Sequence, residues 1–132
     1  MTGLQLVESA LWAEQAQAQS ALSAGDVVGI PAIGPVANRY AALTFVSKQA
    51  VCGVAGSPAS GVDDFFQLIT GGVFTVNCTE DSTISVGTRL QLSTTLGEVE
   101  EITLSSNAIF IAVTAKDGSN QCRARFIKAE QN

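Results

Sequence analysis

Short apolar runs separated by turn residues fill the chain from residue 25 onward, and this pattern limits the fold more than any other feature. The runs are about four to eight residues long, which is typical of β-strands and too short for most helices. Glycine, proline and small polar residues interrupt them roughly every 8–12 residues, as in all-β sandwiches and barrels. We therefore predict a mainly β fold, a compact sandwich or barrel of about nine short strands, over residues 25–132.

The clearest predicted hairpin lies near the end of the chain, where residues 108–115 and 121–127 flank a polar loop. Apolar and polar residues alternate in the second run, so its apolar side chains would face the core while Arg123 and Arg125 face solvent. A shorter alternation over residues 89–93 predicts another strand of the same kind.

Two adjacent glycines, Gly71 and Gly72, separate two further apolar runs at 64–70 and 73–78. A glycine pair in this setting predicts either a tight hairpin or a bulge that bends one continuous strand. The sequence leaves both alternatives open.

Residues 1–24 differ from the rest of the chain, because they contain a single glycine and no proline. Alanine and glutamine dominate residues 14–19, and both favour helices. We predict an N-terminal amphipathic helix or arm over residues 1–24, ahead of the β-domain at 25–132. The segment could close the core of its own domain, reach another chain as a helix, or form an extended arm. On a helix, five apolar residues of the segment would lie close to one stripe: Leu4, Val7, Leu11, Ala18 and Leu22.

Histidine is absent, and the formal net charge of the 132-residue chain is −5. The absence of histidine excludes Ser-His-Asp and Cys-His nucleophile systems and histidine-containing zinc sites. A protein that binds a phosphate backbone is usually basic, so nucleic acid is not expected as a partner. No apolar run is long enough to span a membrane, and the first residues lack the basic region of a signal peptide. We expect a soluble, non-enzymatic protein with no cofactor, no metal and no membrane partner.

The chain has three cysteines, Cys52, Cys78 and Cys122, and no two of them form a C-x-x-C motif. We interpret them as reduced, half-buried thiols in strands, which suits a reducing cytosol; one disulfide plus a free thiol is the alternative. Asn77 begins a formal glycosylation sequon, which we interpret as a chance match.

Acidic residues gather at Glu98, Glu100 and Glu101. A carboxylate pair for glycoside hydrolysis or a calcium site is one interpretation, but the spacing fits no EF-hand loop. We favour solvated loops and polar strand faces.

The order of several glycine- and valine-rich segments resembles that of the small capsid decoration proteins of tailed bacteriophages, also called cement or head-stabilising proteins. The resemblance covers roughly residues 25–127. The segments that carry it are GDVV at 25–28, AVCGVA at 50–55, GGVFTV at 71–76, ISVGTRL at 84–90, IFIAVTA at 109–115 and CRARF at 122–126.

This resemblance implies a structural virion protein, made in the host bacterial cytoplasm, that binds the outer surface of the phage head. It would bridge subunits of the major capsid protein, commonly as a homotrimer, and stabilise the shell. The alternative is a carbohydrate- or receptor-binding β-module such as a tail-fibre domain; such modules expose aromatic side chains, whereas most phenylalanines here fall in core patterns. A protein that binds a capsid needs assembly contacts, and the candidates are Leu4, Val7, Leu11, Trp12, Arg123 and Arg125.

Trp12, the only tryptophan, is the strongest of these candidates, since aromatic anchors are frequent in interfaces. A buried role within its own domain is the alternative. Arg123 and Arg125, with Lys116 and Lys128 nearby, form a local basic excess. They could dock on an acidic capsid region or pair with glutamates on a neighbouring strand.

Overall fold

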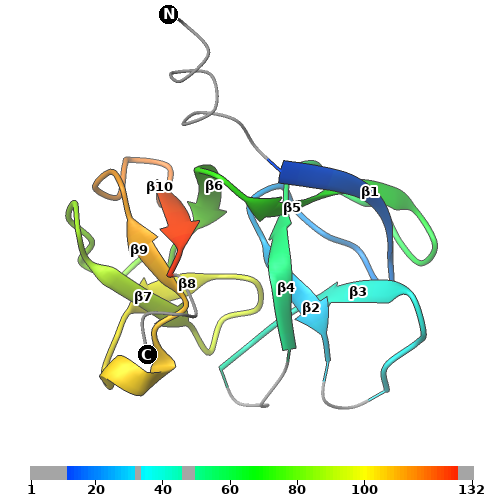
Figure 1. Cartoon of the computed structure of the whole chain (residues 1–132), viewed down its shortest axis with the longest axis horizontal. Helices are drawn as coiled ribbons and strands as arrows, with labels where there is room; N and C mark the ends of the chain where they lie inside the picture. Colours follow the sequence, from blue (N-terminus) through cyan, green and yellow to red (C-terminus); the bar gives the residue numbers. More distant parts are fainter. Residues whose placement is uncertain (1–11, 32–33, 46–49, 128–132) are drawn as a thin grey trace, which may run out of the picture.

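A computed structural model describes residues 12–31, 34–45 and 50–127, and in these residues the predicted mainly β fold is confirmed (Figure 1). Ten strands and one short 3-10 helix are present there. In chain order they are β1 (Trp12–Ala18), β2 (Val27–Ile30), β3 (Arg39–Ala42), β4 (Ala50–Ala55), β5 (Phe65–Gly71), β6 (Phe74–Asn77), β7 (Arg89–Leu92), β8 (Val99–Glu101), η1 (Ser105–Asn107), β9 (Phe110–Ala112) and β10 (Gln121–Phe126).

The first five strands form a closed barrel in the order β1-β3-β2-β4-β5. Strand β1 closes it, because β1 pairs in parallel with β3 and antiparallel with β5. Barrel closure leaves none of these strands with a free edge, which removes a common route to aggregation.

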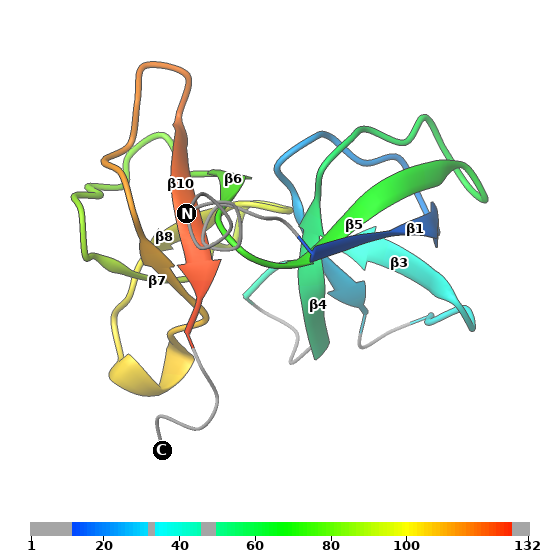
Figure 2. The same cartoon turned by 45° about the horizontal axis from the view of Figure 1, so that its top comes forward.

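The other five strands form a second, antiparallel sheet in the order β6-β10-β9-β7-β8, which lies beside the barrel (Figure 2). Its two outer strands approach each other, since Cys78 directly after β6 forms a bridge with Val99 in β8. The sheet is therefore strongly curved.

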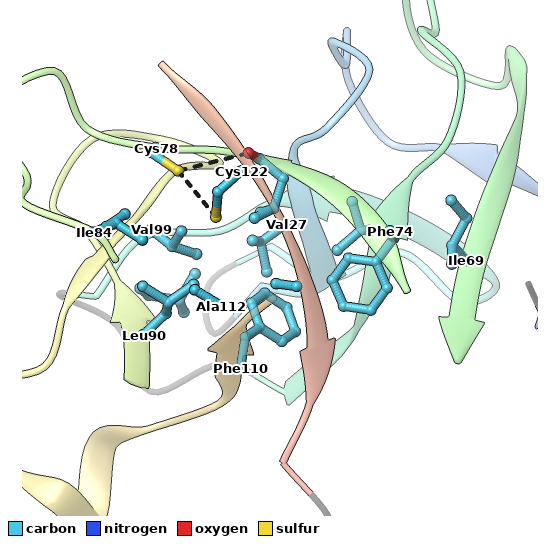
Figure 3. Packing of buried hydrophobic residues seen from close by; sticks show 14 of the residues in the cluster. Val27, Ile69, Phe74, Cys78, Ile84, Leu90, Val99, Phe110, Ala112 and Cys122 are labelled. Atoms are coloured by element: carbon cyan, nitrogen blue, oxygen red, sulfur yellow. Dashed lines mark hydrogen bonds between the residues drawn. The ribbon is translucent and has the colours of Figure 1, made fainter. Parts of the chain in front are cut away.

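The main core lies between the barrel and the second sheet (Figure 3). Val27, Val54 and Ile69 from the barrel belong to the same buried cluster as Phe74 and Phe110 from the second sheet. The rings of Phe74, Phe110 and Phe126 pack edge-to-face, with centroids 4.9–5.4 Å apart, an arrangement that aromatic rings favour. A smaller cluster fills the inside of the barrel, and its residues are Ala18, Leu22, Val28, Ala42, Ala55, Ala59, Phe66 and Leu68.

The glycine pair at 71–72 marks the crossing between the two sheets. Strand β5 ends in the barrel at Gly71, and β6 begins in the second sheet at Phe74, so the two strands do not form a hairpin. Gly72 has a φ of 85°, a conformation that glycine adopts without strain. Of the two alternatives, a bend in the chain is therefore closer to the structure.

The helix predicted within residues 1–24 is wrong for residues 12–18, which form strand β1. Pairing with β3 and β5 satisfies the backbone of this segment, so tertiary contacts override the helical propensity of alanine and glutamine. Ala16 and Ala18 contact the core of the barrel, while Gln15 is exposed. The extended alternative holds for this part of the segment, and residues 1–11 lie outside the described residues.

The predicted C-terminal hairpin is confirmed. Strands β9 and β10 pair antiparallel, with Ala124 opposite Ala112 and Phe126 opposite Phe110. In the loop, the Asp117 carboxylate accepts hydrogen bonds from the backbone N–H groups of Ser119 and Gln121. The loop is thus held by a local side-chain bond of the kind that favours aspartate in turns.

All three cysteines are free, as predicted, but the prediction that each is half-buried in a strand holds only for Cys52. Cys52 is half-buried, whereas Cys78 and Cys122 are fully buried and their sulfur atoms lie 3.6 Å apart. The hydrogen bond to Cys122 and burial raise the pKa of the Cys78 thiol. A thiol held in its protonated form is a poor nucleophile, which suits a packing role.

Candidate functional site

The outer face of the second sheet carries a group of arginines set around an apolar side chain. Leu90, Phe110 and Ala124 point into the core, so Arg89, Ile111 and Arg125, each next to one of them, point outward. The strand register places Arg89 and Arg125 on either side of Ile111, in one row across β7, β9 and β10. We call Arg89, Ile111, Arg123 and Arg125 the arginine face.

Arg123 also reaches the boundary between the two sheets. It lies opposite Thr75 in β6 and lines a hollow of about 280 Å³ at the junction. Gln67 and Ile69 of the barrel line the other side of this hollow. The arginine face therefore extends from the middle of the second sheet to the edge of the barrel.

None of these arginines forms an ion pair within the described residues, where the one ion pair joins Arg39 to Asp63 on the barrel at 2.7 Å. The predicted alternative, cross-strand pairing with glutamates, is wrong for this part of the structure. The cross-strand neighbours of Arg123 and Arg125 are Thr75 and Ile111, neither of which is acidic. Among the described residues, therefore, no carboxylate occupies these guanidinium groups.

Lys116 does not belong to this surface, although the sequence places it close to Arg123. Its ammonium group donates hydrogen bonds to the carbonyl oxygens of Glu80 and Ser82, each at 2.5 Å, and of Thr79 at 3.3 Å. The lysine stabilises the turn after β6. Lys128 lies outside the described residues.

Arg89 is the one arginine of the arginine face that the sequence did not single out. It lies 34 positions before Arg123, so no local pattern connects the two. The usable signal is the alternation over 89–92, which predicts that Arg89 faces away from the buried Leu90. Only the register through Ile111 shows that Arg89 and Arg125 share a row.

Trp12 lies on the surface at the start of β1, and its side chain is 69% exposed. The indole packs over Gly71, where an added Cβ would lie 3.0 Å from the ring. The alternative of a buried role for Trp12 is therefore excluded in this structure. The other candidates from the same segment, Leu4, Val7 and Leu11, lie outside the described residues.

Two carboxylates of the acidic cluster, those of Glu100 and Glu101, accept hydrogen bonds from within the protein. The Glu100 carboxylate accepts a bond from the side-chain amide of Gln91 at 2.8 Å. The Glu101 carboxylate accepts one from the backbone N–H of Thr83 at 3.0 Å. Across the described ranges, no group of three histidine, cysteine, aspartate or glutamate residues is placed to hold a metal ion, and no helix is long and apolar enough to cross a membrane.

No family model matches the chain, and no curated protein matches its sequence. Among solved structures, the chain is similar to one described as "The crystal structure of head fiber gp8.5 N base in bacteriophage phi29". The TM-score is 0.63 at 16% sequence identity, and the match covers 89% of this chain and 95% of that chain. At this identity the match establishes a shared fold. The sequence resembles phage head proteins, and the fold also occurs in the base of a phage head fiber. The two observations agree.

Proposed function

We propose that this chain is a structural protein of a tailed-bacteriophage head and that it binds the outer surface of the shell through the arginine face. The observation that carries the proposal is the likeness in fold to the base of a phage head fiber, which extends over nearly the whole of both chains. The decoration-protein resemblance of residues 25–127 supports the same class of function.

The arginine face is suited to such a contact. It combines guanidinium groups, which bind carboxylates in a bidentate manner, with the apolar side chain of Ile111 at its centre. The chain as a whole carries a net charge of −5, so this positive surface is a local feature that favours one orientation on an acidic partner.

The proposal extends to the details of assembly. The protein acts without catalysis, as a homotrimer, and bridges neighbouring subunits of the major capsid protein. Three copies of one modest surface give tight attachment, because binding of the second and third copies becomes intramolecular once the first has docked. Bridging of this kind stabilises the shell by linking subunits that would otherwise separate.

The test is co-sedimentation of the purified chain with heads of the parent phage that lack it. The double variant Arg123→Glu with Arg125→Glu should lose binding by at least about tenfold, since it replaces attraction by repulsion at the contact. The control Arg123→Lys with Arg125→Lys keeps the positive charge and should retain most of the binding.

Thermal melting of each variant checks the fold, which should be unchanged because both arginine side chains are exposed. Binding by the folded glutamate variant that equals the wild type would rule out the arginine face as the contact. Failure of the wild-type chain to bind heads at all would overturn the proposed function itself.

A further inference from the structure

A second surface, on the barrel, has a different chemistry. Strands β1 and β5 pair so that Gln15 lies directly opposite Gln67, and Gln17 opposite Phe65. Phe66 points into the barrel core, so Phe65 and Gln67 point outward. The result is an aromatic ring beside a pair of facing amides.

This surface is hollowed on both sides of the ring. A hollow of about 420 Å³ is lined by Phe65, Gln15, Gln67, Glu14 and Ser57, which together we call the amide face. A smaller hollow of about 240 Å³ lies on the side of Gln17 and Tyr40, and Phe65 lines it as well. The ring of Phe65 thus stands between two depressions and is 55% exposed.

Two side-chain amides of the amide face have no hydrogen-bond partner among the described residues. Within the described residues, the side-chain amides of Gln15 and Gln67 form no hydrogen bond, although the backbone N–H of Gln67 donates to Ser57 Oγ at 2.9 Å. An amide presents two donors and an acceptor. A pair of them on one strand face gives a set of neutral hydrogen-bonding groups.

The turn before Phe65 is held firmly. The Asp64 carboxylate accepts bonds from the backbone N–H of Ser60 at 2.7 Å and from its hydroxyl at 2.9 Å. These bonds lower the pKa of Asp64. The neighbouring Asp63 forms the ion pair with Arg39. The backbone that carries the exposed ring is thereby ordered in advance, which lowers the cost of binding.

We propose that the amide face binds a neutral oligosaccharide. A pyranose ring presents C–H groups on one face, which stack on an aromatic ring, and hydroxyl groups at its edge, which bond to amides and carboxylates. Phe65 supplies the ring, and Gln15 and Gln67 supply the amides.

The charge of the surface selects a neutral ligand. Among the described residues, no lysine or arginine lines the larger hollow, and Glu14 is the one charged residue there, so nothing in this lining attracts phosphate or sulfate groups. Nucleic acids and anionic lipids are therefore disfavoured.

The test uses the ¹⁵N-labelled full chain, titrated with cellohexaose, maltohexaose and chitohexaose while its amide signals are followed by NMR. At least one of these probes should shift the side-chain amide signals of Gln15 and Gln67 in a saturable manner, with a dissociation constant of about 1 mM, because a shallow site contacts few atoms.

The variant Phe65→Ala should weaken this binding by about tenfold, since it removes the stacking surface. Phe65→Trp should retain it. The matched control Phe45→Ala removes another exposed phenylalanine, at 43% exposure and outside the amide face, and should bind as the wild type does.

The proposal is overturned if none of the three probes shifts these signals up to about 10 mM, or if Phe65→Ala binds as tightly as the wild type. Its failure is separable from that of the proposed function. Phe65→Ala leaves the arginine face intact, and co-sedimentation with phage heads should be unchanged.

Discussion

At the scale of single residues, Asn77 joins the barrel to the second sheet. Its side-chain amide nitrogen donates to the carbonyl of Ala24 at 3.0 Å and to the carboxylate of Asp26 at 3.1 Å, and its carbonyl oxygen accepts from Gln121 at 2.8 Å. Both N–H groups of the amide are used, so a glycan on this nitrogen would break the network. This agrees with a chance match to the sequon.

Asp26, in the same network, predicts a dependence of stability on pH. Burial raises the pKa of Asp26 above its ordinary value of 3.8, and hydrogen bonds from the backbone of Ser23 and the side chain of Asn77 partly oppose this. The folded protein then binds the Asp26 proton more tightly than the unfolded chain does. Ionised Asp26 therefore lowers the free energy of unfolding at neutral pH, and this cost disappears as the pH falls through the raised pKa towards 3.8.

The measurement is urea denaturation of the wild type and Asp26→Asn between about pH 7 and about pH 4. The wild type should gain stability relative to the variant as the pH falls. Taking this difference cancels the contributions of the other carboxylates, which are common to both proteins. A difference that stays constant across the range would contradict the argument.

Gln91 shows where residue-level prediction from sequence fails. The alternation over 89–93 predicts a polar, solvent-facing Gln91, but its side chain is only 2% exposed. It donates to Glu100 at 2.8 Å and accepts from the backbone N–H of Thr103 at 3.1 Å. These partners lie outside the strand that carries Gln91. The local pattern therefore could not show that the buried amide has hydrogen-bond partners.

At the scale of strands, prediction succeeded where pairing is local. The hairpin of β9 and β10 has its turn and its alternation within about 20 residues. Strand β1, by contrast, pairs with β5 about 50 positions further on, and its alternation of alanine and glutamine also suits a helix. The period-two pattern at Gln15, Ala16, Gln17 and Ala18 was present, but propensity favoured the other assignment.

The barrel depends on a close approach between β4 and β5 at Gly53. A Cβ added at Gly53 would lie 2.2 Å from the carbonyl oxygen of Ile69, a backbone atom that the sheet holds in place. Gly53→Ala should therefore lower the free energy of unfolding by about 2–3 kcal/mol, since the two strands must separate.

The control for this variant is Gly61→Ala, because a Cβ at Gly61 meets no atom within 4 Å. Its stability should lie within about 0.5 kcal/mol of the wild type. Chemical denaturation of both variants gives the comparison. Equal stabilities for the two would show that β4 and β5 move apart at little cost.

At the scale of the whole molecule, the sequence predicted a sandwich or a barrel but not their combination. The structure contains a closed barrel and a curved sheet that share one core. The strand order depends on pairings between distant segments, and periodicity reports only which face of a strand is buried. For the same reason, Arg123 and Arg125 could be placed on an outer face, but their row with Arg89 could not.

The arrangement of edges bears on how copies of the chain assemble. The barrel has no free edge, and the outer strands of the second sheet approach each other through Cys78 and Val99. Association by strand pairing is therefore disfavoured among the described elements. A trimer must then form through side-chain contacts, and the exposed indole of Trp12 is the largest aromatic surface available for them.

Light scattering coupled to size exclusion should accordingly give a mass of about 41 kDa for the wild type, three times the 13.6 kDa of one chain. Trp12→Ala should shift the mass towards the monomer at the same concentration, because it removes the anchor of the contact. Val86→Ala is the matched control, since Val86 is 72% exposed, and it should leave the mass unchanged. A trimer that survives Trp12→Ala would place the contact elsewhere. A wild-type monomer at every concentration would contradict a trimer in solution and favour the alternative of a carbohydrate- or receptor-binding module.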